Sequence, residues 1–254
     1  MHFKYAKLTD IGNFRKANQD YLTFSTNKFG QSFGIVCDGM GGHAHGEIAS
    51  KIAVDSFVKM FDSYDFNNLN NSEINKWLRK SVNEILEKMI DYASIHKETL
   101  DMGTTLTAIL FANKKAYVVN IGDSRTYKLV NNNLFQISQD QNLWNSTPEE
   151  DRDEIKTNNN IFGKTSDVTF WKVLTSALGP SKTLRIDTYF LEDPYGVFIL
   201  TSDGVHDYFD EEIVVATLQN QKLKLKDKAQ LIISDAKDNM STDNLSILII
   251  EVSV

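Results

Sequence analysis

Cysteine and proline are scarce in this chain, which has one cysteine and three prolines in 254 residues. A single thiol, Cys37, cannot form an internal disulfide and fits a reducing compartment, so we expect a cytoplasmic protein. No serine- and proline-rich linker and no long charge run divides the chain. Because this length is common for one large domain, we predict a single domain over residues 1–254.

Long apolar runs and an excess of basic residues are also absent. No stretch of about eighteen apolar residues is available to span a bilayer, and residues 1–20 lack the apolar centre of a secretory signal. The chain carries 34 acidic against 27 basic residues, a net charge of −7, which argues against nucleic acid as the main partner. We expect a soluble monomer that binds neither membranes nor nucleic acid.

Alternating and continuous apolar runs predict a strand-rich chain. Short connections between the middle strands favour antiparallel pairing, so we predict an α+β fold of mainly antiparallel sheets with helices packed outside. Ser72 is the expected N-cap of the clearest helix. The predicted strands are 21–26, 32–38, 103–111, 116–123, 125–130, 134–138, 196–203 and 244–252, and the predicted helices are one after the glycine-rich loop, 72–93, 210–219 and 226–238.

Four aspartates stand at the ends of these predicted strands. Asp38, Asp123 and Asp203 each close a strand, and Asp243 precedes one. In an antiparallel sheet the end of one strand lies beside the start of its neighbour, so we expect all four at one edge. One such aspartate alone would be an ordinary turn residue. Four crowded carboxylates repel unless a cation neutralises them, and their oxygens suit Mg²⁺ or Mn²⁺.

The glycine-rich loop "VCDGMGGHAHGE" at 36–47 admits rival interpretations. Residues 39–44 satisfy a relaxed dinucleotide pattern, but Asp38 would repel a pyrophosphate and the antiparallel strands do not suit that fold. A Walker-type phosphate loop requires a string that the chain lacks. These observations favour a carboxylate that binds metal over a backbone that binds phosphate.

Cysteine and histidine chemistry at the same loop is less favoured. A thiolate phosphatase would need an arginine six positions after Cys37, where His43 stands, so Cys37 is interpreted as a small buried strand residue. His43 and His45 have a spacing compatible with zinc, but no third histidine or cysteine lies nearby to complete a site. We expect structural roles for both histidines.

The motifs, taken in order, resemble those of the metal-dependent protein phosphatases of the PP2C (PPM) class, bacterial branch, over nearly the whole chain. This resemblance implies an α-β-β-α sandwich of two mainly antiparallel sheets, with a binuclear metal site at one end. The motifs are "RKANQD", "DGMGGHAHGEIAS", "MGTTLTAIL", "VVNIGDSRTYKL", "SQDQNL", "LTSALG", "LTSDGVHD" and "STDNLSILII".

The resemblance also implies a set of metal ligands. Asp38 would bridge two Mn²⁺ or Mg²⁺ ions, Asp203 and Asp243 would complete the first, and the Gly39 carbonyl would help to hold the second. Asp123 matches the position that joins the Asp203 position at a third, weaker metal.

Two further residues take catalytic roles by the same resemblance. Asp20 would hold metal-bound waters, and Arg15 would bind the substrate phosphate, since a guanidinium donates two parallel hydrogen bonds. A water activated between two cations attacks phosphorus directly, so no nucleophilic side chain is required. The implied substrates are phosphoserine and phosphothreonine in proteins, and the implied partner is a serine/threonine kinase.

Departures from the family pattern leave two alternatives open. Gln19 stands where many relatives carry glutamate, and this loss of a negative charge near the second metal makes a phosphoprotein-binding module conceivable. A metal-dependent phosphoesterase for small molecules is the other alternative. Residues 145–172 correspond to the family's variable flap, which would select substrates or serve as a plain surface loop.

Overall fold

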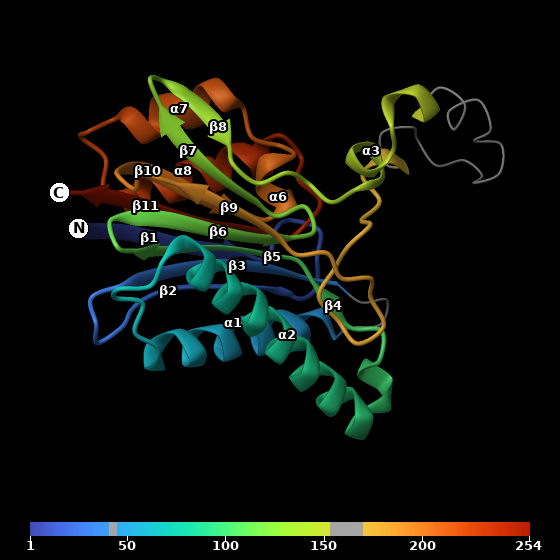
Figure 1. The fold of residues 1–254 in the computed structure, drawn as a ribbon. Coiled ribbons are helices and arrows are strands. Elements are labelled where there is room, and N and C mark those ends of the chain that lie inside the picture. The colour runs from blue at the N-terminus through green and yellow to red at the C-terminus, as the bar shows by residue number, and fades with distance from the viewer. Residues whose placement is uncertain (41–44, 153–169) are drawn as a thin grey trace.

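Two β-sheets lie face to face between outer helices in the computed structural model, which describes residues 1–40, 45–152 and 170–254 (Figure 1). One sheet has the order β1-β11-β10-β7-β8, and the other has the order β2-β3-β5-β6-β9 with β4 paired to β3. Every pairing between these strands is antiparallel. The predicted α+β class with antiparallel sheets is confirmed.

All strands expected from the sequence are present, and two more complete the sheets. The additional strands, β1 and β9, are edge strands with one strand partner each, so much of their surface stays exposed and their apolar alternation is weak. The strands are β1 (His2–Asp10), β2 (Asp20–Thr26), β3 (Ser32–Met40), β4 (Gly103–Thr104), β5 (Leu106–Ala112), β6 (Lys115–Ile121), β7 (Arg125–Val130), β8 (Asn133–Gln136), β9 (Asp187–Leu191), β10 (Gly196–Thr201) and β11 (Leu245–Ser253).

The continuous apolar runs are explained by strands that are covered on both faces. On β3, Val36 packs into the core between the sheets, while its neighbours Ile35 and Cys37 pack against the helices. The same alternation places Ile109 of β5 between the sheets and Leu110 under the helices. Burial of both faces gives each central strand a fixed register, because a slip of one residue would exchange its two faces.

Helices cover the outer face of each sheet (Figure 1). α1 (Gly46–Ser63) and α2 (Asn71–Ile95) pack on the sheet that contains β3, and α7 (Glu211–Gln219) and α8 (Leu225–Asp238) pack on the other. The predicted N-cap of the long helix was wrong. Asn70, two residues before Ser72, caps α2 by accepting from the Glu73 N–H at 3.0 Å, while the Glu73 carboxylate accepts from the Asn70 N–H at 2.8 Å.

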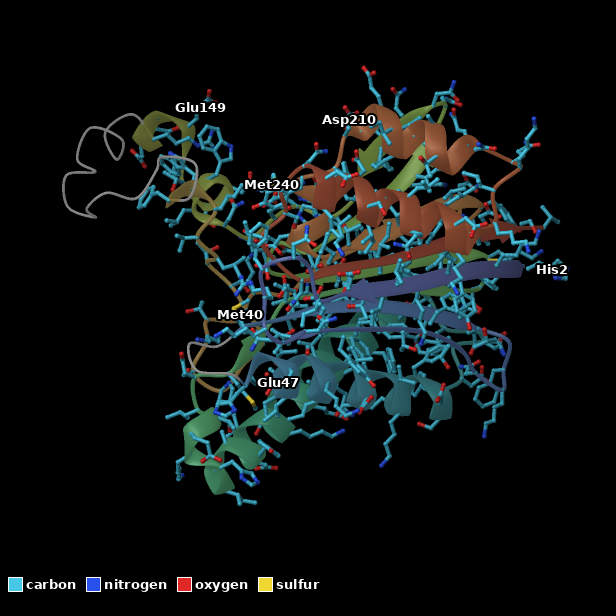
Figure 2. All side chains as sticks on the ribbon, turned by 180° about the vertical axis from the view of Figure 1, so that it is seen from behind. His2, Met40, Glu47, Glu149, Asp210 and Met240 are labelled. Carbon is cyan, nitrogen blue, oxygen red and sulfur yellow. The ribbon has the colours of Figure 1, made fainter. Side chains whose placement is uncertain are left out.

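The two ends of the sandwich differ in what they carry. Met40, Glu47 and Met240 lie at one end, and His2 lies at the other (Figure 2). At the first end the chain continues into short elements, α3 (Leu143–Ser146) and α6 (Asp203–His206). Of the predicted flap, residues 145–152 and 170–172 are described, and the remainder lies outside the described residues. No described helix has both the length and the apolar character that crossing a membrane requires.

Candidate metal centre

Strand register places the first pair of acidic side chains side by side. Asp20 opens β2 and is the direct partner of Asp38 on β3. Thr104 and Thr105 hold the backbone of Asp38. The Asp38 N–H donates to the Thr105 hydroxyl at 3.0 Å, and the Asp38 carbonyl accepts from the Thr105 N–H at 2.8 Å and the Thr104 hydroxyl at 2.9 Å. The sheet therefore fixes the position of the Asp38 carboxylate.

The second pair comes from the opposite sheet. Asp203 begins α6 directly after β10, and Asp243 lies two residues before β11, which pairs with β10. The Asp203 and Asp38 carboxyl groups are close enough to interact directly, and the charge of Asp243 acts on both. Asp38, Asp203 and Asp243 therefore influence one another at one end of the sandwich, with Asp20 beside Asp38. Their roles as metal ligands stay predictions.

Burial and mutual repulsion change the acidity of this cluster. Burial is the main cause that raises the pKa of Asp20 to about 7 and that of Asp203 to about 6, and the neighbouring carboxylates add to it. The same two causes raise the pKa of Asp38 well above its usual range. The Oδ1 atoms of Asp20 and Asp203 are buried without a hydrogen-bond partner. Unpaired, crowded oxygen donors of this kind fit a hard divalent cation.

The carboxylates are close together but are partly occupied by other contacts. Arg15 donates from Nη2 to Asp243 Oδ2 at 2.5 Å and from Nε to the Thr242 carbonyl at 3.3 Å. Within the described part of the chain, no three His, Cys, Asp or Glu side chains are already placed to hold one ion. Binding of a cation would therefore require Asp243 to leave Arg15 and the Asp38–Asp203 contact to open.

Asp123 lies next to this cluster, in the turn between β6 and β7. Burial raises the pKa of Asp123 well above its usual range, and the charges of Asp203, Asp140 and Asp207 raise it further. Asp123 is thus near Asp203, and its role at a third metal stays a prediction. The sequence reasoning missed Asp140 and Asp207, although both stand in the quoted motifs "SQDQNL" and "LTSDGVHD".

The chain is similar to known proteins over nearly its whole length. The protein phosphatase 2C family model matches residues 15–235. The serine/threonine phosphatase stp of Listeria welshimeri is 30% identical over 252 residues, which are 99% of this chain and 96% of that protein. The chain belongs to the protein phosphatase 2C family.

Solved structures of phosphatase 2C proteins have the same fold. The serine/threonine phosphatase Stp1 from Staphylococcus aureus superposes with a TM-score of 0.83 at 25% identity, and the match covers 100% of this chain and 96% of that one. The catalytic domain of PstP, solved with two manganese ions, superposes with a TM-score of 0.76 at 25% identity, with 99% of both chains covered.

Close backbone contacts hold the glycine-rich end of β3 in this phosphatase 2C chain. A Cβ on Gly39 would stand 2.1 Å from the Gly46 carbonyl oxygen and 2.5 Å from that of Gln19, so only glycine fits. The Gln19 carbonyl accepts from the Gly39 N–H at 3.1 Å and the Ser50 hydroxyl at 2.6 Å. The Gln19 side chain donates to Glu47 at 3.3 Å. Gln19, the residue that departs from the family pattern, therefore contacts Gly39, which directly follows Asp38.

Two polar residues that the sequence reasoning missed hold the phosphatase 2C site together. Asn244 donates to the Ile11 and Ala17 carbonyls, both at 2.9 Å, and accepts from the Gln19 N–H at 2.8 Å, so it shapes the loop that carries Arg15. Ser202 donates to Asp20 Oδ2 at 2.8 Å. Asn244 follows Asp243 directly, and Ser202 precedes Asp203, so the motifs themselves contained the signal.

The structure describes the single cysteine and two of the histidines in the quoted motifs. Cys37 is fully buried, as predicted, and burial raises the pKa of its thiol. His206 is also buried, contacts the Thr201 hydroxyl through Nδ1 at 2.9 Å, and has a strongly lowered pKa because of burial. His45 precedes α1 without a side-chain capping bond. His43 lies outside the described residues.

Proposed function

We propose that this protein is a metal-dependent protein phosphatase that hydrolyses phosphoserine and phosphothreonine with two Mn²⁺ or Mg²⁺ ions. The observation that carries the proposal is the electrostatic coupling of Asp20, Asp38, Asp203 and Asp243. Asp20 and Asp203 each also have a buried oxygen without a partner. The names of the relatives support the activity, and the manganese ions in PstP support the metal.

The ligand assignment is the one that the family resemblance implies, and the position of Asp38 supports it. Asp38 is central, because the charges of both Asp203 and Asp243 act on it, and it would bridge two ions. Asp203 and Asp243 would complete the first ion, and the Gly39 carbonyl would contribute to the second. Asp123 would join Asp203 at a third, weaker ion.

Two divalent ions, when bound, lower the pKa of a water between them and neutralise charge on the phosphoryl oxygens. The chain's own residues position the reactants around that chemistry. Asp20 is held by Ser202 through Oδ2, and its Oδ1 has no partner and would orient water. Arg15 would exchange its bond to Asp243 for two bonds to the substrate phosphate. The one cysteine is buried in the core, consistent with a reaction that needs no thiol nucleophile.

The partners and the setting follow from the same proposal. Phosphorylated proteins are the substrates, and a serine/threonine kinase is the partner that supplies them. We infer a cytoplasmic monomer, one phosphatase domain over residues 1–254, and a variable flap at about 145–172. The single cysteine and the net charge of −7 support the compartment and the lack of a nucleic-acid partner.

The test is turnover of p-nitrophenyl phosphate and of a phosphothreonine peptide by the purified chain. We expect turnover with Mn²⁺ and none with excess chelator, and we expect Asp203→Asn to abolish turnover. Asp227→Asn, on the exposed surface of α8, is the matched control and should retain full activity. Tight phosphopeptide binding without phosphate release would identify a binding module instead. A strong preference for small phosphoesters would identify a small-molecule phosphoesterase.

A further inference from the structure

A groove of about 660 Å³ lies between the β7–β8 hairpin and α3. Residues Arg125 and Gln139 line one side, and Trp144 and Trp171 line the other. The α3 side is attached by the Leu143 N–H, which donates to the Val173 carbonyl at 2.9 Å. Figure 1 shows α3 beyond the end of the sheets, at the end where α6 also lies. The reaction proposed above gives no role to these tryptophans.

One residue that lines this groove, Trp171, carries an unused hydrogen-bond donor. Trp171 is 6% exposed, and its Nε1 is buried with no hydrogen-bond partner. A buried indole N–H is normally paired, and leaving one unpaired is unfavourable. The Trp144 ring meets the Trp171 ring edge to face, with centroids 5.4 Å apart. The groove therefore offers an aromatic wall and one donor that lacks an acceptor.

The charged groups of the groove already have partners. Arg125 donates to Asp140 from Nε at 2.8 Å and from Nη2 at 2.6 Å. Lys172 donates to Asp207 at 2.7 Å. A charged side chain entering the groove would therefore displace an existing partner or lose hydration without compensation. An uncharged, apolar side chain would meet neither obstacle.

The groove lies near the acidic cluster. Asp140 accepts from Arg125, and Asp207 accepts from Lys172. The charges of both aspartates raise the pKa of Asp123. Arg125 itself lies two residues after Asp123. A peptide whose phosphorylated residue reaches the cluster would therefore bring neighbouring residues to this groove.

We propose that the groove binds an uncharged, apolar segment of the phosphoprotein substrate next to the phosphorylated residue, with a substrate backbone carbonyl accepting from Trp171 Nε1. This inference rests on the proposed phosphatase function and adds a substrate class to it. Trp171 and Trp144 are then specificity residues that contact the substrate away from the reacting phosphorus.

The test uses phosphothreonine peptides with alanine at all flanking positions, each position being replaced in turn by leucine or aspartate. With Mn²⁺, we expect the leucine peptide to exceed the aspartate peptide by at least about 5-fold in kcat/KM at one or two positions. The reason is that burial of an unpaired charge lowers affinity by more than about tenfold. Trp171→Phe keeps the aromatic ring and removes the donor. It should raise KM for the preferred peptide about 2- to 10-fold and leave p-nitrophenyl phosphate turnover unchanged.

A matched control and a second variant separate specificity from folding. Trp77→Phe makes the same exchange in α2, where Trp77 packs on Phe57 and Phe66. It should change the turnover of neither the peptide nor p-nitrophenyl phosphate. Trp144→Ala removes the aromatic wall and should reduce the preference for leucine. The proposal is overturned if both groove variants keep the wild-type preference, or if Trp171→Phe reduces p-nitrophenyl phosphate turnover equally.

A binding measurement keeps this inference separate from the proposed function. The same peptides, made with a phosphonate in place of the phosphate and a fluorescent label, are titrated with protein and followed by anisotropy. Tighter binding of the leucine peptide that is lost in Trp171→Phe supports the groove even if the wild type shows no turnover, a result that would contradict only the proposed function. Equal binding of leucine and aspartate peptides would overturn the groove.

Discussion

Two neighbouring regions of this molecule hold buried charge in opposite ways. Beside β7, the Asp140 carboxylate accepts two bonds from Arg125 and a third from Gln136, so both of its oxygens are satisfied. In the acidic cluster, Asp20 and Asp203 each leave one buried oxygen without a partner. The two regions share the same end of the sandwich, because the charge of Asp140 acts on Asp123.

The difference separates residues that maintain the fold from residues that are available for chemistry. A buried ion pair with complete hydrogen bonding is structurally neutral or useful, and removing one partner is costly. Crowded carboxylates without a cation oppose folding and persist only where the surrounding structure compensates. We therefore expect the cluster to lower the stability of the metal-free protein at neutral pH.

The largest expected effect concerns Asp38. Asp38→Asn should reduce turnover by at least about 100-fold, because metal stabilisation of the transition state contributes several kcal/mol. In chelator, the same variant should melt at a higher temperature than the wild type, since one repelling charge is removed. Turnover assays and thermal unfolding test the two halves. Lower stability of Asp38→Asn in chelator would show that the cluster is not strained.

The paired region should respond in the opposite sense. Asp140→Ala leaves the Arg125 guanidinium largely buried without its partner, and we expect it to lower the free energy of unfolding by about 3 kcal/mol. Urea unfolding measures this change. Asp55→Ala, which breaks the exposed pair with Lys51, should cost less than about 1 kcal/mol. Equal costs for the two variants would remove the contrast between a buried pair and a surface pair.

The pH dependence of stability should come from the cluster. The folded-state pKa values of Asp20 and Asp203, about 7 and about 6, lie above their unfolded values, so the folded state binds more protons. Stability in chelator should therefore fall as the pH rises from about 4 to 7, with a loss of at least about 5 °C in melting temperature. Added Mn²⁺ should remove most of this decline, and a flat profile in chelator would contradict the assignment.

The smallest expected effect lies far from both charged regions. Asn70→Ala removes the capping box of α2 and should cost about 1 kcal/mol in the free energy of unfolding. Activity with Mn²⁺ should not change, because α2 supplies no residue of the cluster. Ser72→Ala, at the position first predicted as the cap, should cost less. A larger loss for Ser72→Ala would show that the helix begins later in solution.

Much of the fold could be predicted, and the errors have a common origin. Strands such as β3 and β5 carry apolar residues on both faces, so their pattern is unmistakable. The edge strands β1 and β9 were missed because each has a single strand partner and keeps polar residues in solvent. For the site, Asp38, Asp123, Asp203 and Asp243 were predicted from their places at strand ends. Trp171 was not predicted, because its unpaired N–H has no sequence signature.

The sequence by itself determined the chemistry that the chain offers: oxygen ligands in place of thiols, one buried cysteine, and an arginine near the start of the chain. The tertiary structure alone decided that Asp20 and Asp38 are cross-strand partners, that Asp203 of the other sheet contacts Asp38, and that Arg15 reaches Asp243. The reason is that distances between residues far apart in the chain depend on strand register and on the packing of two sheets over one core. Both are set cooperatively by many apolar contacts, and no local spacing encodes them.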